Sequence, residues 1–241
     1  MIRFLFVADS RGHRFVNYPK PEDKAIPLAS LDFVVIRGAK IYNLVGPTIR
    51  KLNSYSSTDR VVVRLAAGIN DLTAFQYDAT HEYRVLKPSN HSAESLFREL
   101  DNFKRAIQTA RPSAIVSFTT IPPMSFYKFQ KSKKLPVSLL SEDDIQSFQR
   151  SHDTVIDEVN NRIIEHNSIR QSGLVLRTLS WHNSVRKVEK RTHRNKTKRV
   201  KRNHFAHLYD GLHGDSKLKQ RWFSELYSSF LRDYTALRQS S

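Results

Sequence analysis

The chain has 241 residues, of which 39% are hydrophobic, so it is large enough for one α/β domain with a real core and is not disordered by composition. It contains no cysteine, which excludes a disulfide scaffold, a cysteine nucleophile and a thiolate metal site. The net charge is +17, and no apolar stretch approaches the ~20 residues that a membrane helix needs.

Residues 1–8 are almost continuously apolar. They are too few for the hydrophobic region and cleavage site of a secretory signal, and they are typical of a buried strand. We therefore expect a protein without signal peptide or membrane span that works inside the cell, in the cytoplasm or the nucleus.

Five short apolar runs rich in β-branched residues predict strands. They are residues 2–8, 33–36, 61–67, 114–120 and 174–178. The first, third and fourth are nearly continuous in apolar residues, which is typical of parallel strands covered on both faces. Residues 121–140 follow the fourth run and are interpreted as an excursion from the sheet, a candidate lid.

Helical periodicity separates these runs. Residues 92–110 place apolar side chains on one face, residues 141–167 begin with a capping-box pattern at Ser141, and residues 215–235 form the last amphipathic stretch. The alternation predicts a single domain over residues 1–241, a three-layer α/β/α sandwich with a five-stranded parallel sheet. Ligands of such sheets bind beyond the carboxyl ends of the strands.

Four short segments place reactive polar residues where a strand is followed by a loop, or just before the final helix. They are Ala8-Asp9-Ser10-Arg11-Gly12, Arg37-Gly38-Ala39, Gly68-Ile69-Asn70-Asp71 and Asp210-Gly211-Leu212-His213. Each segment alone is a common turn or cap signal. In this order they resemble the conserved blocks of the SGNH (GDSL-type) hydrolases, a family of esterases and lipases, and the resemblance covers nearly the whole chain.

The resemblance implies a flavodoxin-like architecture and a serine hydrolase mechanism on an acyl or O-acetyl ester, through an acyl-serine intermediate and without metal or organic cofactor. Ser10 would be the nucleophile, His213 the general base and Asp210 the carboxylate that orients it. The backbone N–H groups of Ser10 and Gly38 and the side-chain amide of Asn70 would form the oxyanion hole.

Two positions depart from the family pattern. Ala8 stands where the family has a glycine, and Arg11 stands where a small residue is usual. Arg11 either contacts an anionic substrate or obstructs the pocket. We interpret Asp71 as a structural hydrogen-bonding partner and Tyr209 as a packing residue.

Residues 186–204 hold ten Lys or Arg and one Glu, a net +9 of the total +17. With no hydrophobic period they are expected to form a solvated loop or a weakly helical arm. Three interpretations stay open: a contact with nucleic acid or another polyanion, a rim that attracts anionic substrates, and a solvated insert. The polyanion contacts would be Arg191, Arg194, Lys196, Lys198, Arg199, Lys201 and Arg202. A hydrolase-fold binding module acting through this segment is therefore the alternative to the enzyme.

The pair His204 and His207 has the spacing of metal ligands. Without cysteine or a companion carboxylate pattern we expect no metal site there.

Overall fold

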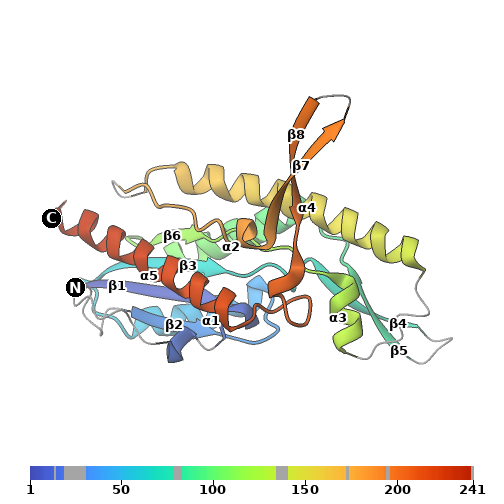
Figure 1. Ribbon diagram of the computed structural model, residues 1–241. Helices are drawn as coiled ribbons and strands as arrows, with labels where there is room; N and C mark the ends of the chain where they lie inside the picture. Colours follow the sequence, from blue (N-terminus) through green and yellow to red (C-terminus); the bar gives the residue numbers. More distant parts are fainter. Residues whose placement is uncertain are drawn as a thin grey trace.

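The computed structural model describes residues 1–13, 15–18, 31–78, 83–133, 141–171, 174–193 and 196–239. Its centre is a parallel sheet of four strands in the order β2-β1-β3-β6 (Figure 1). The strands are β1 (Ile2–Ala8), β2 (Leu31–Val35), β3 (Arg60–Ala66) and β6 (Ile115–Phe118). Ala8 of β1 pairs with Val35 and with Ala66, so three neighbouring strands end at the same level. Four of the predicted strands are confirmed to within a few residues.

Alternating side chains of β1 face two separate cores. Leu5 and Val7 belong to a cluster with α1 (Ile41–Asn53), α2 (Ala93–Ala110) and α4 (Glu142–Ser168). Phe4 and Phe6 belong to a second cluster with α5 (Ser216–Gln239). A sheet covered by helices on both faces explains why the strand runs are nearly continuous in apolar residues. The predicted three-layer sandwich and its three predicted helices are confirmed.

The prediction of a fifth strand over residues 174–178 is wrong. Only an isolated bridge joins Leu174 to Gln171, and residues 175–180 have no regular secondary structure. The edge of β6 is instead satisfied by three carboxamides, each of which accepts from the N–H and donates to the carbonyl of one residue. Gln171 pairs with Val116, Asn167 with Phe118, and Asn160 with Ile121, over distances of 2.7–3.3 Å. These side-chain amides supply the hydrogen bonds that the backbone of a fifth strand would otherwise make with this edge.

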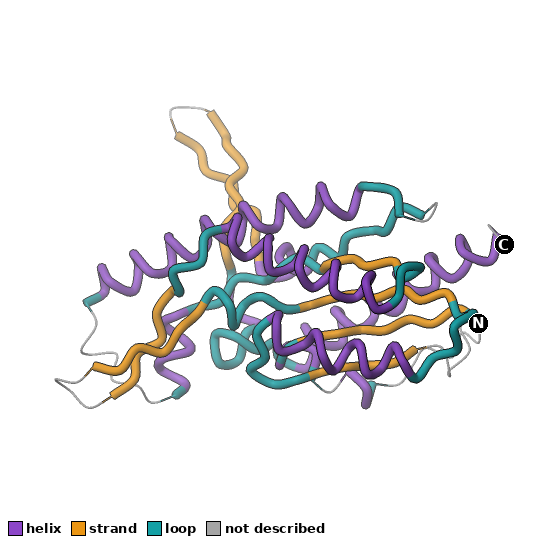
Figure 2. Tube along the Cα trace, turned by 180° about the vertical axis from the view of Figure 1, so that it is seen from behind, coloured by secondary structure: helices purple, strands orange, loops and turns teal. Residues whose placement is uncertain are grey.

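The basic segment is a β-hairpin, which corrects the prediction of a loop or helical arm. Strands β7 (Arg186–His193) and β8 (Lys196–Asn203) pair antiparallel over eight positions. The hairpin projects from the body of the molecule beside α4, and both views show it standing clear of the sheet (Figures 1 and 2). Its base joins the 3-10 turns η5 (Trp181–Val185) and η6 (Phe205–His207).

Two further elements, a β-hairpin and a short helix, lie in the segments that connect the strands of the sheet to the long helices. A hairpin of β4 (Thr73–Asp78) and β5 (Tyr83–Pro88), which was not predicted, follows the 68–71 segment. The candidate lid contains α3 (Phe126–Ser132), whereas residues 134–140 lie outside the described residues. Within the described ranges, no helix combines the length and apolarity that crossing a membrane requires.

Candidate active site

Ser10 begins a 3-10 turn, η1 (Ser10–Gly12), directly beyond the end of β1. The turn is held by Asp9, whose carboxylate accepts from the backbone N–H of Arg11 at 2.9 Å. It also packs unusually close to the strand, since a Cβ at Gly12 would lie 2.5 Å from the Cβ of Ala8. The alanine at position 8 is therefore compatible with this turn because position 12 has no side chain.

His213 connects the serine with a buried carboxylate. Its Nε2 lies 2.9 Å from Ser10 Oγ, and its Nδ1 lies 2.7 Å from Asp210 Oδ2. The other oxygen of Asp210 accepts from the backbone N–H groups of His213 at 2.7 Å and Leu212 at 3.0 Å. Burial raises the pKa of Asp210, but the bonds from the His213 ring and from these N–H groups outweigh it and lower the pKa to about 2. Asp210 is thus ionised at any pH where the histidine can act as a base.

The loop that carries Asp210 and His213 is fixed against α3. Gly211 has a φ of +83°, and a Cβ there would lie 2.5 Å from the carbonyl oxygen of Ser125 and 2.6 Å from the backbone nitrogen of Phe129. The N–H of Ser125 donates to the Gly211 carbonyl at 2.8 Å. The candidate lid segment therefore supplies a support for the Asp-His loop, and only glycine fits at their contact.

The residues expected at the oxyanion hole follow three neighbouring strands. Ser10, Gly38 and Asn70 come after β1, β2 and β3, and Gly38 has a φ of +69° in the turn after β2. The amide of Asn70 donates to the carbonyl of Ala39 at 3.0 Å, which ties the two outer turns together. That bond uses one of the two amide hydrogens, so a second remains as a donor.

Asp71 has the structural role expected of it. Its carboxylate accepts from the backbone N–H of Ile41 at 3.2 and 3.3 Å, at the first residue of α1. Burial raises the pKa of Asp71 to about 6, although this hydrogen bond opposes the shift. The carboxylate thus holds the start of α1 beside the Gly38 turn.

Arg11 does not reach the pocket that opens beside Ser10. It is only 3% exposed and lines a buried cavity of about 10 Å³ together with Asp9 and Thr119. Burial lowers the pKa of Arg11 to about 10, opposed by the charges of Asp9 and Asp210. The structure therefore places the predicted substrate contact in the interior, beside the two carboxylates of the site.

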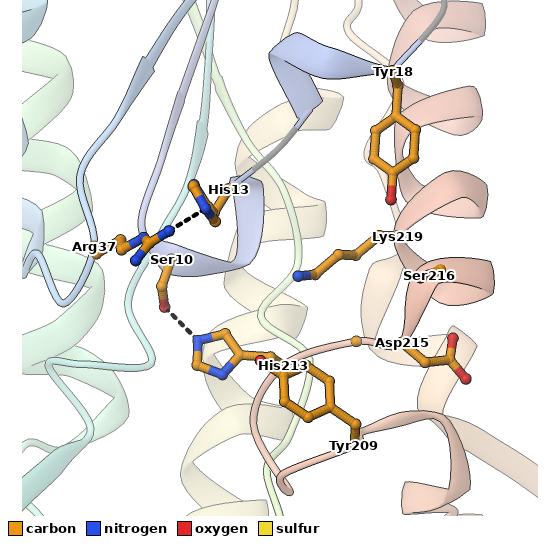
Figure 3. Close-up of a pocket in the computed structure, with 10 residues that line it drawn as sticks. Ser10, His13, Tyr18, Arg37, Tyr209, His213, Asp215, Ser216 and Lys219 are labelled. Atoms are coloured by element: carbon orange, nitrogen blue, oxygen red, sulfur yellow. Dashed lines mark hydrogen bonds between the residues drawn. The ribbon is translucent and has the colours of Figure 1, made fainter.

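The pocket beside Ser10 has a volume of about 610 Å³ and is shown in Figure 3. Besides Ser10 and His213, its lining includes His13, Tyr18, Arg37, Tyr209 and Lys219, none of which the sequence predicts as a pocket residue. Tyr209, interpreted as a packing residue, is 65% exposed and stacks on the His213 ring with centroids 5.9 Å apart. That interpretation is wrong because the tyrosine forms part of the pocket wall.

Solved structures share this fold over nearly their whole length. A member of the lipolytic G-D-S-L family from Veillonella parvula has a TM-score of 0.52 and 10% identity, and the match covers 96% of this chain and 100% of the other. A carbohydrate esterase of family 3 from Talaromyces cellulolyticus has a TM-score of 0.52 and 13% identity, and the match covers 98% of this chain and 99% of the esterase. An acetyl esterase variant with a bound acetate ion has a TM-score of 0.53 and 13% identity, and the match covers 98% of this chain and 100% of the variant. The chain has the SGNH (GDSL-type) hydrolase fold. No protein-family model and no curated protein sequence matches it.

In this SGNH fold the sheet brings the first three of the four predicted segments to one edge, and the turn before α5 brings the fourth.

The basic residues predicted to contact a polyanion lie elsewhere, on the β7–β8 hairpin, except Arg194, which is outside the described residues. His207 bonds to Asp215 at 2.9 Å. Among the described residues, no three His, Cys, Asp or Glu side chains gather as metal ligands would.

Proposed function

We propose that the protein is a serine esterase that hydrolyses an acyl or O-acetyl ester through an acyl-serine intermediate. The observation that carries the proposal is the continuous chain of contacts from Ser10 Oγ to His213 and on to the Asp210 carboxylate, at 2.9 and 2.7 Å. A serine hydroxyl becomes nucleophilic when a positioned base accepts its proton, and these distances are those of working hydrogen bonds.

Acylation would begin when Ser10 Oγ attacks the ester carbonyl carbon and its proton passes to His213 Nε2. The carbonyl π electrons move to the oxygen, and the resulting oxyanion is stabilised by the N–H groups of Ser10 and Gly38 and by the Asn70 amide. The intermediate collapses by breaking the bond to the alcohol oxygen, which takes the proton from His213. Asp210 stabilises the imidazolium throughout.

Deacylation would repeat these steps with water as the nucleophile. His213 accepts a proton from the water, the hydroxide attacks the acyl-serine carbonyl, and Ser10 Oγ leaves with the proton returned by His213. The products are the free acid and the restored enzyme. All steps use protein groups and water alone.

Hydrolysis of 4-nitrophenyl acetate tests the proposal. The protein should release nitrophenolate, and Ser10→Ala should lower kcat by at least about 10⁴-fold because the nucleophile is absent. Ser57→Ala, which alters an exposed serine away from the site, is the matched control and should keep the full rate. Equal rates for the folded protein and for Ser10→Ala would overturn the proposal.

A second function, contact with nucleic acid, is favoured by the register of the β7–β8 hairpin. It places Lys187 opposite Arg202, Lys190 opposite Arg199 and Arg191 opposite Lys198. Like charges at opposed positions destabilise a two-stranded ribbon, and phosphates would relieve that repulsion.

Replacing residues 187–202 with a two-residue Asn-Gly turn tests this second function, because Arg186 and Asn203 are already paired. The full chain should bind double-stranded DNA with an affinity that falls steeply as salt rises, and the shortened chain should lose that binding. Unchanged DNA affinity in the shortened chain would exclude the hairpin as the contact.

A further inference from the structure

The pocket beside Ser10 is rich in basic side chains. Lys219 and Arg37 contribute fixed positive charges to its wall, and His13 and His213 contribute titratable rings. Two tyrosines, Tyr18 and Tyr209, complete this part of the lining (Figure 3). The space where an ester must bind next to the nucleophile is therefore bounded by cations and aromatic rings.

Lys219 lies in the first turns of α5 and is only 9% exposed, although it is a lysine. Its amine points into the pocket, toward the side that carries Ser10 and His213 (Figure 3). The Nζ atom lies 5.9 Å from the centre of the Tyr209 ring, the distance of a cation–π contact. A charge held this deeply interacts more strongly with a bound anion than one on an open surface does.

Arg37 approaches from the opposite wall, in the turn that precedes Gly38. Its guanidinium donates to the Nε2 of His13, so that nitrogen carries no proton in this arrangement (Figure 3). The contact orients the arginine, whose planar group is suited to a carboxylate, sulfate or phosphate. Lys219 and Arg37 thus flank the mouth of the site from two different elements.

Little negative charge opposes these groups. Among the described residues that line the pocket, Asp215 is the only carboxylate. It accepts from the N–H of Leu218 at 2.8 Å and bonds to His207 at 2.9 Å, so it is engaged with the start of α5. The pocket therefore presents a positive potential to an incoming substrate.

We propose, building on the esterase function above, that the pocket selects esters that carry an anionic group, a carboxylate, sulfate or phosphate, held between Lys219 and Arg37. Charge-assisted hydrogen bonds from both side chains would fix this group while the ester carbonyl lies against Ser10. A neutral sugar ester stacked on the tyrosines is the competing substrate, and it has no negative charge for the two cations to pair with.

Three acetate esters of related nitrophenols distinguish these substrates. They are 2-nitrophenyl acetate, which is neutral, 4-acetoxy-3-nitrobenzoate, which carries a carboxylate, and 4-acetoxy-3-nitrobenzenesulfonate, which carries a sulfonate. Each kcat/KM is divided by the rate of hydroxide hydrolysis of the same ester, which removes differences in intrinsic reactivity. We expect the normalised kcat/KM to be higher for both anionic esters and to fall with ionic strength, whereas the value for the neutral ester should not depend on salt.

The variant Lys219→Met removes the buried charge with an apolar side chain of similar length. It should lower the ratio of anionic to neutral kcat/KM by about 10- to 100-fold, and Lys219→Arg should restore much of that ratio. Lys217→Met removes an exposed charge two residues away on the same helix and should leave all rates unchanged. Arg37→Gln, at an exposed position where folding is not at risk, provides an independent variant that should lower the same ratio.

A ratio that stays the same in both Lys219→Met and Arg37→Gln overturns the anion proposal while leaving the esterase intact. Loss of the ratio in Lys217→Met to the same extent also overturns it, because the effect would then be one of overall charge. If the wild-type chain hydrolyses none of the three esters in a Ser10-dependent way, the esterase function itself fails.

Discussion

Two segments of the last third of the chain, separated by only a few residues, are built in opposite ways. The loop from Asp210 to His213 is held by hydrogen bonds to its surroundings. Asp210 is 5% exposed and accepts three hydrogen bonds, and the carbonyl of Gly211 accepts from the backbone N–H of Ser125, the residue that caps α3. The β7–β8 hairpin bonds to itself over eight positions and stands clear of the sheet. It is joined to the body at its base, where His204 donates to the Val185 carbonyl and Arg186 contacts Asp157.

The difference is consistent with the roles proposed above for the two segments. Proton transfer between Ser10 and His213 requires fixed geometry, since a small displacement of a catalytic group is costly. Contact with a polyanion depends on the amount of positive charge and tolerates movement. Catalysis should therefore be sensitive to single changes around the loop and insensitive to the hairpin.

Within these two segments, the largest effect is expected from Asp210→Asn. An amide cannot stabilise the imidazolium and favours the wrong tautomer of His213, so kcat for 4-nitrophenyl acetate should fall by about 10⁴-fold. Asp215→Asn, which changes a carboxylate at the start of α5 outside the triad, is the comparison variant and should have a much smaller effect. A kcat within tenfold of the wild type for Asp210→Asn would show that this carboxylate does not support the base.

Gly211→Ala should be the most destabilising change at the loop. A Cβ at this position meets the backbone of Ser125 and Phe129 at 2.5 and 2.6 Å, and the φ of +83° is unfavourable for alanine. We expect unfolding free energy to fall by about 4 kcal/mol, measured by urea denaturation, because strain and overpacking add. Gly46→Ala, where a Cβ would meet only the end of the Arg50 side chain at 3.6 Å, should cost nothing comparable. Equal stability of the two variants would contradict the close docking of the loop on α3.

A pH effect is expected from Asp71, which holds the start of α1 beside the Gly38 turn. Burial raises its pKa to about 6 from 3.8, so the folded state holds this proton more tightly than the unfolded state does. As pH rises from about 4 to about 7 the wild type should lose about 2 kcal/mol of unfolding free energy relative to Asp71→Asn.

The measurement for Asp71 is the difference between the two unfolding free energies at each pH, which cancels groups common to both proteins. Asn can still accept from Ile41 N–H, so the slope of the difference, and not its absolute value, is the test. Parallel stability curves would show that Asp71 ionises as readily in the folded chain as in the unfolded one.

The smallest effect is expected from the hairpin. Replacing residues 187–202 with an Asn-Gly turn should change kcat/KM for neutral esters by less than about twofold, because the described hydrogen bonds of the loop from Asp210 to His213 do not involve β7 or β8. A loss of more than tenfold, in a chain that melts at the wild-type temperature, would show that the hairpin takes part in the site.

The four segments of the candidate site could be identified in the sequence because each is local: three follow an apolar run, and the fourth directly precedes the last amphipathic stretch. The helices were predictable for the same reason, since Leu96, Leu100, Phe103 and Ile107 repeat on one face of α2 and are all buried. The fifth strand could not be excluded, because what replaces it is the pairing of Asn160, Asn167 and Gln171 with a strand about fifty residues earlier.

The pocket wall was not predictable for a related reason. Tyr18 and Lys219 lie in no motif, and Arg37 is known from the sequence only as the residue before Gly38. The approach of these three residues around the pocket depends on the whole fold. The basic segment has no alternating apolar side chains, so its sequence predicts a solvated loop or a weakly helical arm. Its strands nevertheless pair by backbone bonds that charge patterning does not reveal.

The central claim, that Ser10 is a nucleophile activated by His213, is tested most directly by covalent labelling. The protein is treated with a fluorophosphonate, its intact mass is measured, and the labelled peptide is mapped. We expect one label per chain, on Ser10, and no label above background on folded His213→Ala, because the serine hydroxyl then has no base. A label on another residue, or labelling of His213→Ala at the wild-type rate, would contradict it.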